Sequence, residues 1–232
     1  MKTTLSQLFT ITAIIALTFS CKNEKKNETE TTANEATQEE AQQETNKVNE
    51  EALTYVVDTS NSKIEWVGKK PTEKHTGTIQ IGRGTLSATE SGIKTGVFDI
   101  DMTSITVTDL TGKEKAGLEG HLKGEGEGKE DHFFNVAKFP TATFDITSIN
   151  EKEGKTFIEG DLTIKGIKKA ISFPATASIT PNSLKLTSDV FTINRTEWRV
   201  NYGSKSVFEN LGDKFISDDI EIKISIAANP NS

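Results

Sequence analysis

The sequence predicts an all-β domain, folded as an antiparallel barrel or sandwich, that begins after residue 52. Three observations support this fold class. After residue 52, apolar and polar residues alternate with a period of two in one segment after another, which is the pattern of strands with one buried face. Helical spacing of apolar residues is nowhere as consistent. Eight or more alternating segments occur, at the spacing expected of barrels and sandwiches.

Residues 1–20 are predicted to be an export signal. Lys2 carries the early positive charge, and residues 8–19, LFTITAIIALTF, form an apolar run with the length of a signal-peptide core. Cys21, the only cysteine, follows directly. The segment LTFSC resembles the lipobox of bacterial lipoproteins, which implies lipidation of Cys21; the alternative is an ordinary secretory signal with an incidental cysteine. Both interpretations predict an exported protein, and lipidation would anchor it to a membrane, facing the periplasm or the cell surface.

Residues 21–52 are predicted to be the acylated cysteine and a disordered, acidic tether. This segment has no aromatic residue and only Val48 as a large aliphatic, which is too little apolar surface for a core. Four lysines and nine glutamates between residues 22 and 52 give a net charge of -5, out of -7 for the whole chain. The acidity of the protein therefore belongs mostly to the tether.

The folded domain is predicted to span residues 53–232. In the segment 171–179, ISFPATASI, Ile171 and Phe173 share one face while Ser172 and Ser178 lie on the other. A lipoprotein-like anchor favours a barrel with its apolar face inside over an outer-membrane barrel with its apolar face outside. The expected strands lie at residues 53–58, 63–69, 76–89, 98–102, 142–147, 158–164, 171–179, 183–194 and 219–226.

Six segments, in order along the chain, resemble the YceI-like domain family, also called the lipid or polyisoprenoid-binding domain. Together they cover residues 55–227. They are YVVDTSNSKIEWVGKK (55–70), TGVFDIDMTSI (95–105), LEGHLKG (118–124), DHFFNVAKFPTATFDIT (131–147), IEGDLTIKGIKKAISFPATA (158–177) and FTINRTEWRV (191–200). The resemblance implies a lipocalin-like antiparallel eight-stranded β-barrel with an elongated apolar cavity. It also implies a lipid-binding protein and not an enzyme.

Two departures from the family pattern leave the identity of the ligand open. The segment GEGEGKE, residues 124–130, lengthens a connection that is short in many relatives, and Asp58 is not followed by the usual histidine. We interpret residues 124–130 as a flexible inserted loop at the cavity entrance.

Residues on the apolar face are the candidate ligand contacts, because they would line such a cavity. A filled barrel without a cavity is the alternative. Arg195 is a candidate partner for a lipid headgroup, although a structural pairing with an acidic neighbour explains it equally well. The lysines at 165, 168 and 169 are expected in a solvated turn. The candidate cavity-lining residues are Phe98, Ile100, Met102, Phe144, Ile146, Ile158, Leu162, Ile164, Ile171, Phe173, Ile220, Ile222 and Ile224.

His121 and His132 lie eleven residues apart with Asp131 beside the second, an arrangement that raises the possibility of a metal or acid/base site. Zinc ligands need short, defined spacing on a rigid turn or helix, whereas glycines interrupt the segment between these histidines. Adjacent residues of an extended segment also point to opposite faces, so Asp131 is not expected to orient His132. Solvated loop histidines are the favoured interpretation, and a metal-dependent hydrolase using His121 and His132 is the less favoured one.

Other functional classes lack their signatures. The segments GRGT (82–85) and GEGEG (124–128) precede no convincing helix, so the helix terminus of a phosphate-binding loop is missing. Net negative charge argues against nucleic acid. The sequence thus favours a carrier of an isoprenoid or similar apolar lipid at the cell envelope, with a filled surface or structural barrel as the alternative. No cofactor or metal is expected apart from the lipid, and the oligomeric state stays open.

Overall fold

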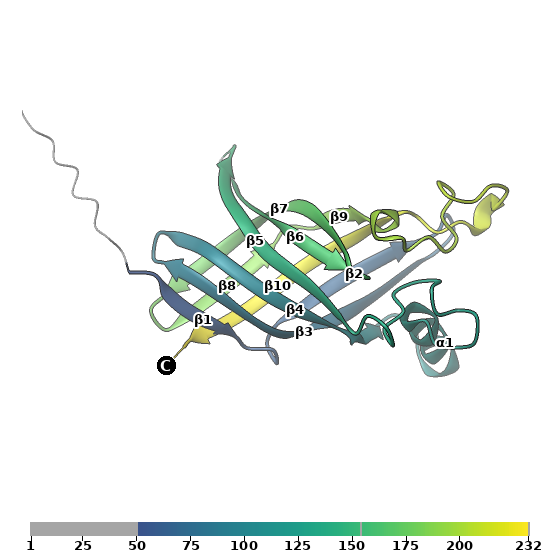
Figure 1. Ribbon diagram of the computed structural model, residues 1–232, viewed down its shortest axis with the longest axis horizontal. Coiled ribbons are helices and arrows are strands. Elements are labelled where there is room, and N and C mark those ends of the chain that lie inside the picture. Colours follow the sequence, from purple (N-terminus) through teal and green to yellow (C-terminus); the bar gives the residue numbers. More distant parts are fainter. Residues whose placement is uncertain (1–50, 154, 232) are drawn as a thin grey trace, which may run out of the picture. The chain divides into compact units, whose positions relative to one another are not determined.

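The computed structural model of the protein describes residues 51–153 and 155–231, in which ten antiparallel strands form one closed sheet (Figure 1). The predicted signal peptide, Cys21 and the tether lie outside the described residues, apart from residues 51 and 52. The strands are β1 Leu53–Val57, β2 Lys63–Lys69, β3 Lys74–Thr89, β4 Gly92–Val107, β5 Thr141–Lys152, β6 Lys155–Ile164, β7 Ile167–Thr180, β8 Ser183–Ser188, β9 Phe191–Asn194 and β10 Asp219–Pro230.

The ring has eight strand positions, although ten strands build it. β1 and β2 both pair with β3 and β10, so they share one position. β8 and β9 pair with successive parts of β10 and share another. The remaining neighbours follow chain order from β3 to β8, and the β8–β10 pairing closes the ring. The predicted antiparallel eight-stranded barrel is therefore confirmed.

The predicted strand at residues 183–194 is broken into β8 and β9. At the break, Ile224 N donates to the side chain of Ser188 at 2.8 Å, and Asp189 N donates to the carbonyl of Pro174 at 2.9 Å. The first bond takes the place of a backbone bond in the ladder to β10, whereas the second continues the pairing of β8 with β7. The alternation of apolar residues does not reveal such a break.

The turn between β6 and β7 is a two-residue hairpin loop. Lys165 and Gly166 both have positive φ, 50° and 74°, as the tight hairpin turn of twisted strands requires. The side chain of Lys165 is only 8% exposed, and its Nζ lies 3.5 Å from a carboxylate oxygen of Asp131. The expectation of a solvated lysine is therefore wrong for Lys165.

One α-helix, α1 (Gly112–Lys123), connects β4 to β5, and the sequence analysis did not predict it. No residue of α1 is fully buried, so no broad apolar stripe marks it in the sequence. Polar contacts hold it to the end of β4: Glu119 accepts from Val107 N at 2.8 Å, and Lys115 Nζ donates to Val107 O at 2.5 Å.

The connection after α1 follows a defined path. Gly124 ends the helix with φ 78°, and Glu125 N donates to Gly120 O at 2.8 Å. Farther along, Phe134 N and Val136 N return to the carbonyls of the last turn of α1. The glycines at 124, 126 and 128 have positive φ and thus serve as turn positions. The flexibility of this loop stays a prediction.

Two short 3-10 helices, η1 (Arg195–Trp198) and η2 (Gly212–Lys214), lie between β9 and β10. Figure 1 shows α1 and the segment 199–218 at the same end of the barrel. No helix among the described residues is long and apolar enough to cross a membrane.

Candidate functional site

A cavity of about 390 Å³ lies inside the barrel, within the roughly 300–1,000 Å³ range of ligand sites. All thirteen residues that the sequence analysis expected to line a cavity do line it. Ten are on β4 to β7 and three on β10, where inward-facing positions alternate with outward-facing ones. Those of β10 are half-buried, whereas Ile158 and Phe173 are almost wholly buried. Their contact with a ligand stays a prediction.

Three aromatic rings lie against glycines of the neighbouring strand, which leaves the lumen open. A Cβ on Gly77 would lie 2.4 Å from the Trp66 ring, and one on Gly160 would lie 2.4 Å from the Phe144 ring. A Cβ on Gly84 would lie 2.7 Å from the Phe98 ring. Because each ring occupies the space of an absent side chain, it covers the barrel wall. Trp66, Phe98 and Phe144 all line the cavity.

A row of phenylalanines lines the inner part of the cavity. Phe173 lies 5.6 Å from Phe144 and 4.6 Å from Phe191, measured between ring centroids, and the second pair is stacked. Phe98 continues the row at 6.3 Å from Phe144. Such surfaces are apolar and rigid, and they suit contact with an unsaturated hydrocarbon chain.

The barrel end that carries β1 is closed by packed side chains. Tyr55, Leu86, Ala88 and Leu184 are buried there and do not line the cavity. Tyr55 Oη donates to the carbonyl of Thr180 at 2.8 Å and so satisfies its buried hydroxyl. The cavity therefore has its mouth at the opposite end.

Further residues line the mouth, and of these the sequence indicated only that Phe133 and Phe134 pack where the chain re-enters the barrel. Leu118 and Leu122 come from α1, Phe133 and Phe134 from the connection to β5, and Ile216 from the segment before β10. Leu118 and Leu122, at i and i+4, share one helix face, which is the one signal that would have indicated α1. The other three lie in irregular segments whose position follows from tertiary packing.

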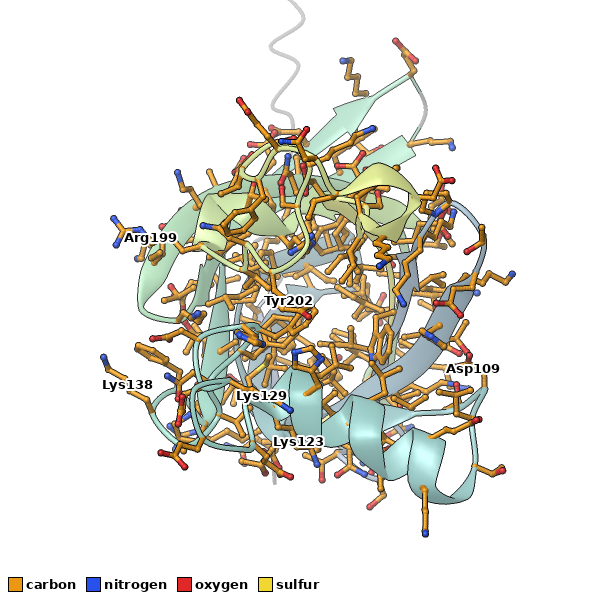
Figure 2. All side chains as sticks on the ribbon, turned by 90° about the vertical axis from the view of Figure 1, so that its right-hand side faces the viewer. Asp109, Lys123, Lys129, Lys138, Arg199 and Tyr202 are labelled. Atoms are coloured by element: carbon orange, nitrogen blue, oxygen red, sulfur yellow. The ribbon has the colours of Figure 1, made fainter. Side chains whose placement is uncertain are left out.

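Polar groups gather around the mouth, which Figure 2 views directly, with Tyr202 over its centre. Lys69, Lys70 and Lys214 contribute to the lining. Lys69 pairs with Glu221, and Lys70 Nζ lies 2.6 Å from Glu73. The mouth is therefore a polar rim around an apolar interior.

His75, which the sequence left unassigned, also lines the cavity at this end. Its Nδ1 lies 2.9 Å from Asp109, which also accepts from Thr76 N at 2.8 Å. Burial would raise the pKa of Asp109, but the bonds from Thr76 and His75 lower it below its ordinary 3.8. The carboxylate thus stays ionised and fixes the orientation of the imidazole.

His121 and His132 meet, contrary to the expectation of separate solvated histidines. One ring donates to the other across 2.8 Å between His121 Nε2 and His132 Nδ1. Tyr202 lies against both rings, with centroids 4.7 Å and 4.4 Å away, and Phe133 packs on His121 at 5.1 Å. This aromatic cluster joins α1, the connection to β5 and the segment 199–218 across the mouth.

Burial lowers the pKa of His121 below its ordinary 6.5, and the charges of His132 and Lys129 add to this effect. The hydrogen bond itself requires one ring nitrogen without a proton. The pair therefore carries at most one positive charge while the bond exists.

Asp131 is not part of this cluster. Its carboxylate accepts from Asn135 Nδ2 at 3.0 Å and pairs with Lys165. In the part of the chain that the structure describes, no group of three or more His, Cys, Asp or Glu side chains is placed to hold a metal ion. Two histidine nitrogens alone fall short of the three or four protein ligands of zinc sites.

Arg195 is buried, at 2% exposure, and backbone carbonyls surround its guanidinium. Nε donates to Ser217 O at 3.0 Å, Nη2 to Ile216 O at 3.1 Å, and Nη1 to Val200 O at 2.5 Å. Nη2 also lies 3.5 Å from Asp218. These contacts favour the structural interpretation, in which Arg195 fastens the segment before β10 to η1. Its role as a headgroup partner stays a prediction.

Comparison with known proteins agrees with this architecture. The YceI-like domain family model matches residues 55–228. The proteins named YceI from Salmonella arizonae and Salmonella newport are each 31% identical over 81 residues, 35% of this chain and 42% of theirs. The matched segment thus spans less than half the length of these relatives.

Two solved structures share the fold. BcnA of Burkholderia cenocepacia aligns with a TM-score of 0.56 and 23% identity, covering 75% of this chain and 99% of BcnA. A domain from Saccharophagus degradans, described as a polyisoprenoid binding domain implicated in plant cell wall breakdown, aligns with a TM-score of 0.53 and 14% identity, covering 77% and 99%. With the closed antiparallel barrel and the family match over most of its length, the chain belongs to the YceI-like domain family.

Proposed function

We propose that the barrel binds an isoprenoid or similar long apolar lipid in its cavity and sequesters or carries this lipid at the cell envelope. The cavity carries the proposal, because it is open at one end, closed at the other and lined mainly by aliphatic and aromatic side chains. The Saccharophagus neighbour, described as a polyisoprenoid binding domain, supports the same class of ligand.

The physical basis is the transfer of hydrocarbon out of water. Each buried CH₂ contributes about 0.8 kcal/mol, so one five-carbon unit contributes about 4 kcal/mol. Ordering of the lipid chain offsets part of this gain. Since the lining offers apolar contact throughout and polar groups at the rim, the hydrocarbon would lie inside and a polar end would stay near the mouth.

The proposed place of action rests on the sequence of the N-terminal segment. Export by residues 1–20, lipidation of Cys21 and a tether up to residue 52 would hold the barrel near a membrane. These residues lie outside the described part of the chain, apart from residues 51 and 52.

The two alternatives have less support. A filled structural barrel conflicts with the cavity of about 390 Å³. A hydrolase would need a nucleophile or a metal beside His121 and His132, and the carboxylate of Asp131 is engaged with Asn135 and Lys165.

Mass spectrometry of an organic extract tests the proposal. The full chain is purified from its own or a related host, together with a Cys21→Ser variant that cannot carry an acyl anchor. We expect the same long-chain isoprenoid-type lipid, near one per protein, in both extracts. Empty protein that also fails to bind added isoprenoids would overturn the proposal.

A further inference from the structure

The segment 199–218 has two sides with different surroundings. Tyr202, Lys214 and Ile216 line the cavity mouth from this segment. Farther out, Val207 and Phe208 are adjacent and are 46% and 49% exposed. Figure 1 shows this segment projecting from the end of the barrel that also carries α1. An apolar tip is thus continuous with the mouth of an apolar cavity.

The tip is presented by a built turn. Ser204 is fully buried, its N–H donates to Asn201 O at 3.0 Å, and its carbonyl accepts from Phe208 N at 2.9 Å. Ile216 N donates to Gly203 O at 2.8 Å, which ties the two arms of the segment together. Because backbone bonds fix the turn, exposure of Val207 and Phe208 is a property of the fold.

The other exposed large aliphatic residues lie elsewhere, on strands of the barrel wall or in one connection between strands. Leu53 and Val56 are on β1, Val97 is on β4, and Val190 is in the β8–β9 connection. Scattered residues of this kind are normal on soluble proteins. Val190 therefore serves as a matched control for the tip.

The surroundings of the tip suit a lipid headgroup region. Lys205 Nζ lies 4.5 Å from the ring centroid of Phe215, and Lys214 is exposed at the mouth. Lysine stems cover apolar surface while their charges reach water or lipid phosphates, and Glu209 and Asp213 of the same segment offset their charge. Tyr202, 40% exposed over the mouth, is of the residue type that is enriched at membrane interfaces.

We propose that this tip docks on the surface of a lipid bilayer, with Val207 and Phe208 inserted among the headgroups and the cavity mouth facing the membrane. A stable protein partner normally buries about 1,200 Å² or more, which exceeds what two adjacent side chains offer. Two exposed apolar side chains can insert into a bilayer surface without a partner surface of complementary shape. The purpose of docking, which rests on the proposed function, is to pass the lipid into the cavity without exposing it to water.

A fluorophore at the tip tests docking directly. In the full chain with Cys21→Ser, Val207→Cys or the control Val190→Cys is labelled with the environment-sensitive dye NBD and mixed with phosphatidylethanolamine–phosphatidylglycerol vesicles. We expect a blue shift and brighter emission at position 207 and none at 190. Binding through the N-terminal segment is common to both proteins and leaves this difference intact.

Three results would overturn docking. The first is that the dye at 207 stays in water although the protein floats with the vesicles. The second is that the dyes at 207 and 190 respond equally. The third is that the dye at 207 responds to protein concentration in the absence of vesicles. The last result would assign the tip to self-association.

Lipid transfer tests the purpose of docking. The double variant Val207→Asp/Phe208→Asp should take up an isoprenoid from vesicles about tenfold more slowly than the wild type, or slower still. The control Val190→Asp should take it up at the wild-type rate. The wild type, the double variant and Val190→Asp should all take up the same isoprenoid from detergent micelles at the same rate. Unchanged uptake from vesicles would contradict the inference. Failure of the proposed function would differ, since no protein would then take up isoprenoid from either source.

Discussion

Replacing Ala142 by tryptophan should displace the lipid and leave the barrel folded. Ala142 is buried on β5 opposite Ile100 and lines the cavity, so the indole would project into the space of about 390 Å³. If it takes the place of one five-carbon unit, burial worth about 4 kcal/mol is lost, at about 0.8 kcal/mol per CH₂. This loss corresponds to roughly a thousandfold weaker affinity.

Thr143→Trp is the matched control, because the next residue of a strand points to the opposite face and Thr143 does not line the cavity. Affinity is measured by displacement of a fluorescent isoprenoid analogue, and folding by circular dichroism and thermal unfolding. We expect the control to bind as the wild type does. A folded Ala142→Trp protein with unchanged affinity would refute a ligand inside the barrel, and so would equal losses in both variants.

Three further variants test the structural roles of Gly77, Arg195 and His121. Gly77→Ala should lower the free energy of unfolding by about 1–3 kcal/mol, because its Cβ would lie 2.0 Å from Thr106 O. The control Gly82→Ala meets only ordinary contacts and should be neutral or stabilising. Equal urea midpoints for the two variants would contradict this prediction. Arg195→Met should cost about 3–5 kcal/mol, since it leaves three backbone carbonyls without their donor and removes the ion pair of Asp218, which keeps its bond from Ser206. A cost below about 1 kcal/mol in urea unfolding would argue against the fastening role. For His121, whose pKa is lowered in the folded protein, the unfolded state takes up its proton first as pH falls, so stability should fall as the pH drops through the ordinary 6.5 and below it. His121→Phe should reduce this loss, and an identical loss in both proteins would show that the histidine pair does not cause it.

The strands and the cavity wall could be predicted because a barrel repeats one simple pattern. In β7, Ile171 and Phe173 face inward as their alternation predicts, and β2 has the predicted bounds Lys63–Lys69. Local residue spacing determines which face of a strand is apolar. The aromatic–glycine pairs were not foreseen, because each joins two strands through their register.

The mouth could not be predicted in the same way. α1 is held by polar contacts to the end of β4, so its apolar residues are few, and only Leu118 and Leu122 mark a face. His121 and His132 meet because α1 ends at Gly124 and the chain turns back on it. Arg195 finds its partners among carbonyls 5 to 22 residues away. Such contacts depend on tertiary geometry that residue spacing does not encode.

A crystal structure of the protein purified from its own host tests the central claim most directly. We expect continuous, elongated electron density inside the barrel, beside Phe144 and Phe173 and reaching Ile216 at the mouth. Ordered water in that space, or side chains moved inward to fill it, would rule out a lipid bound in the barrel.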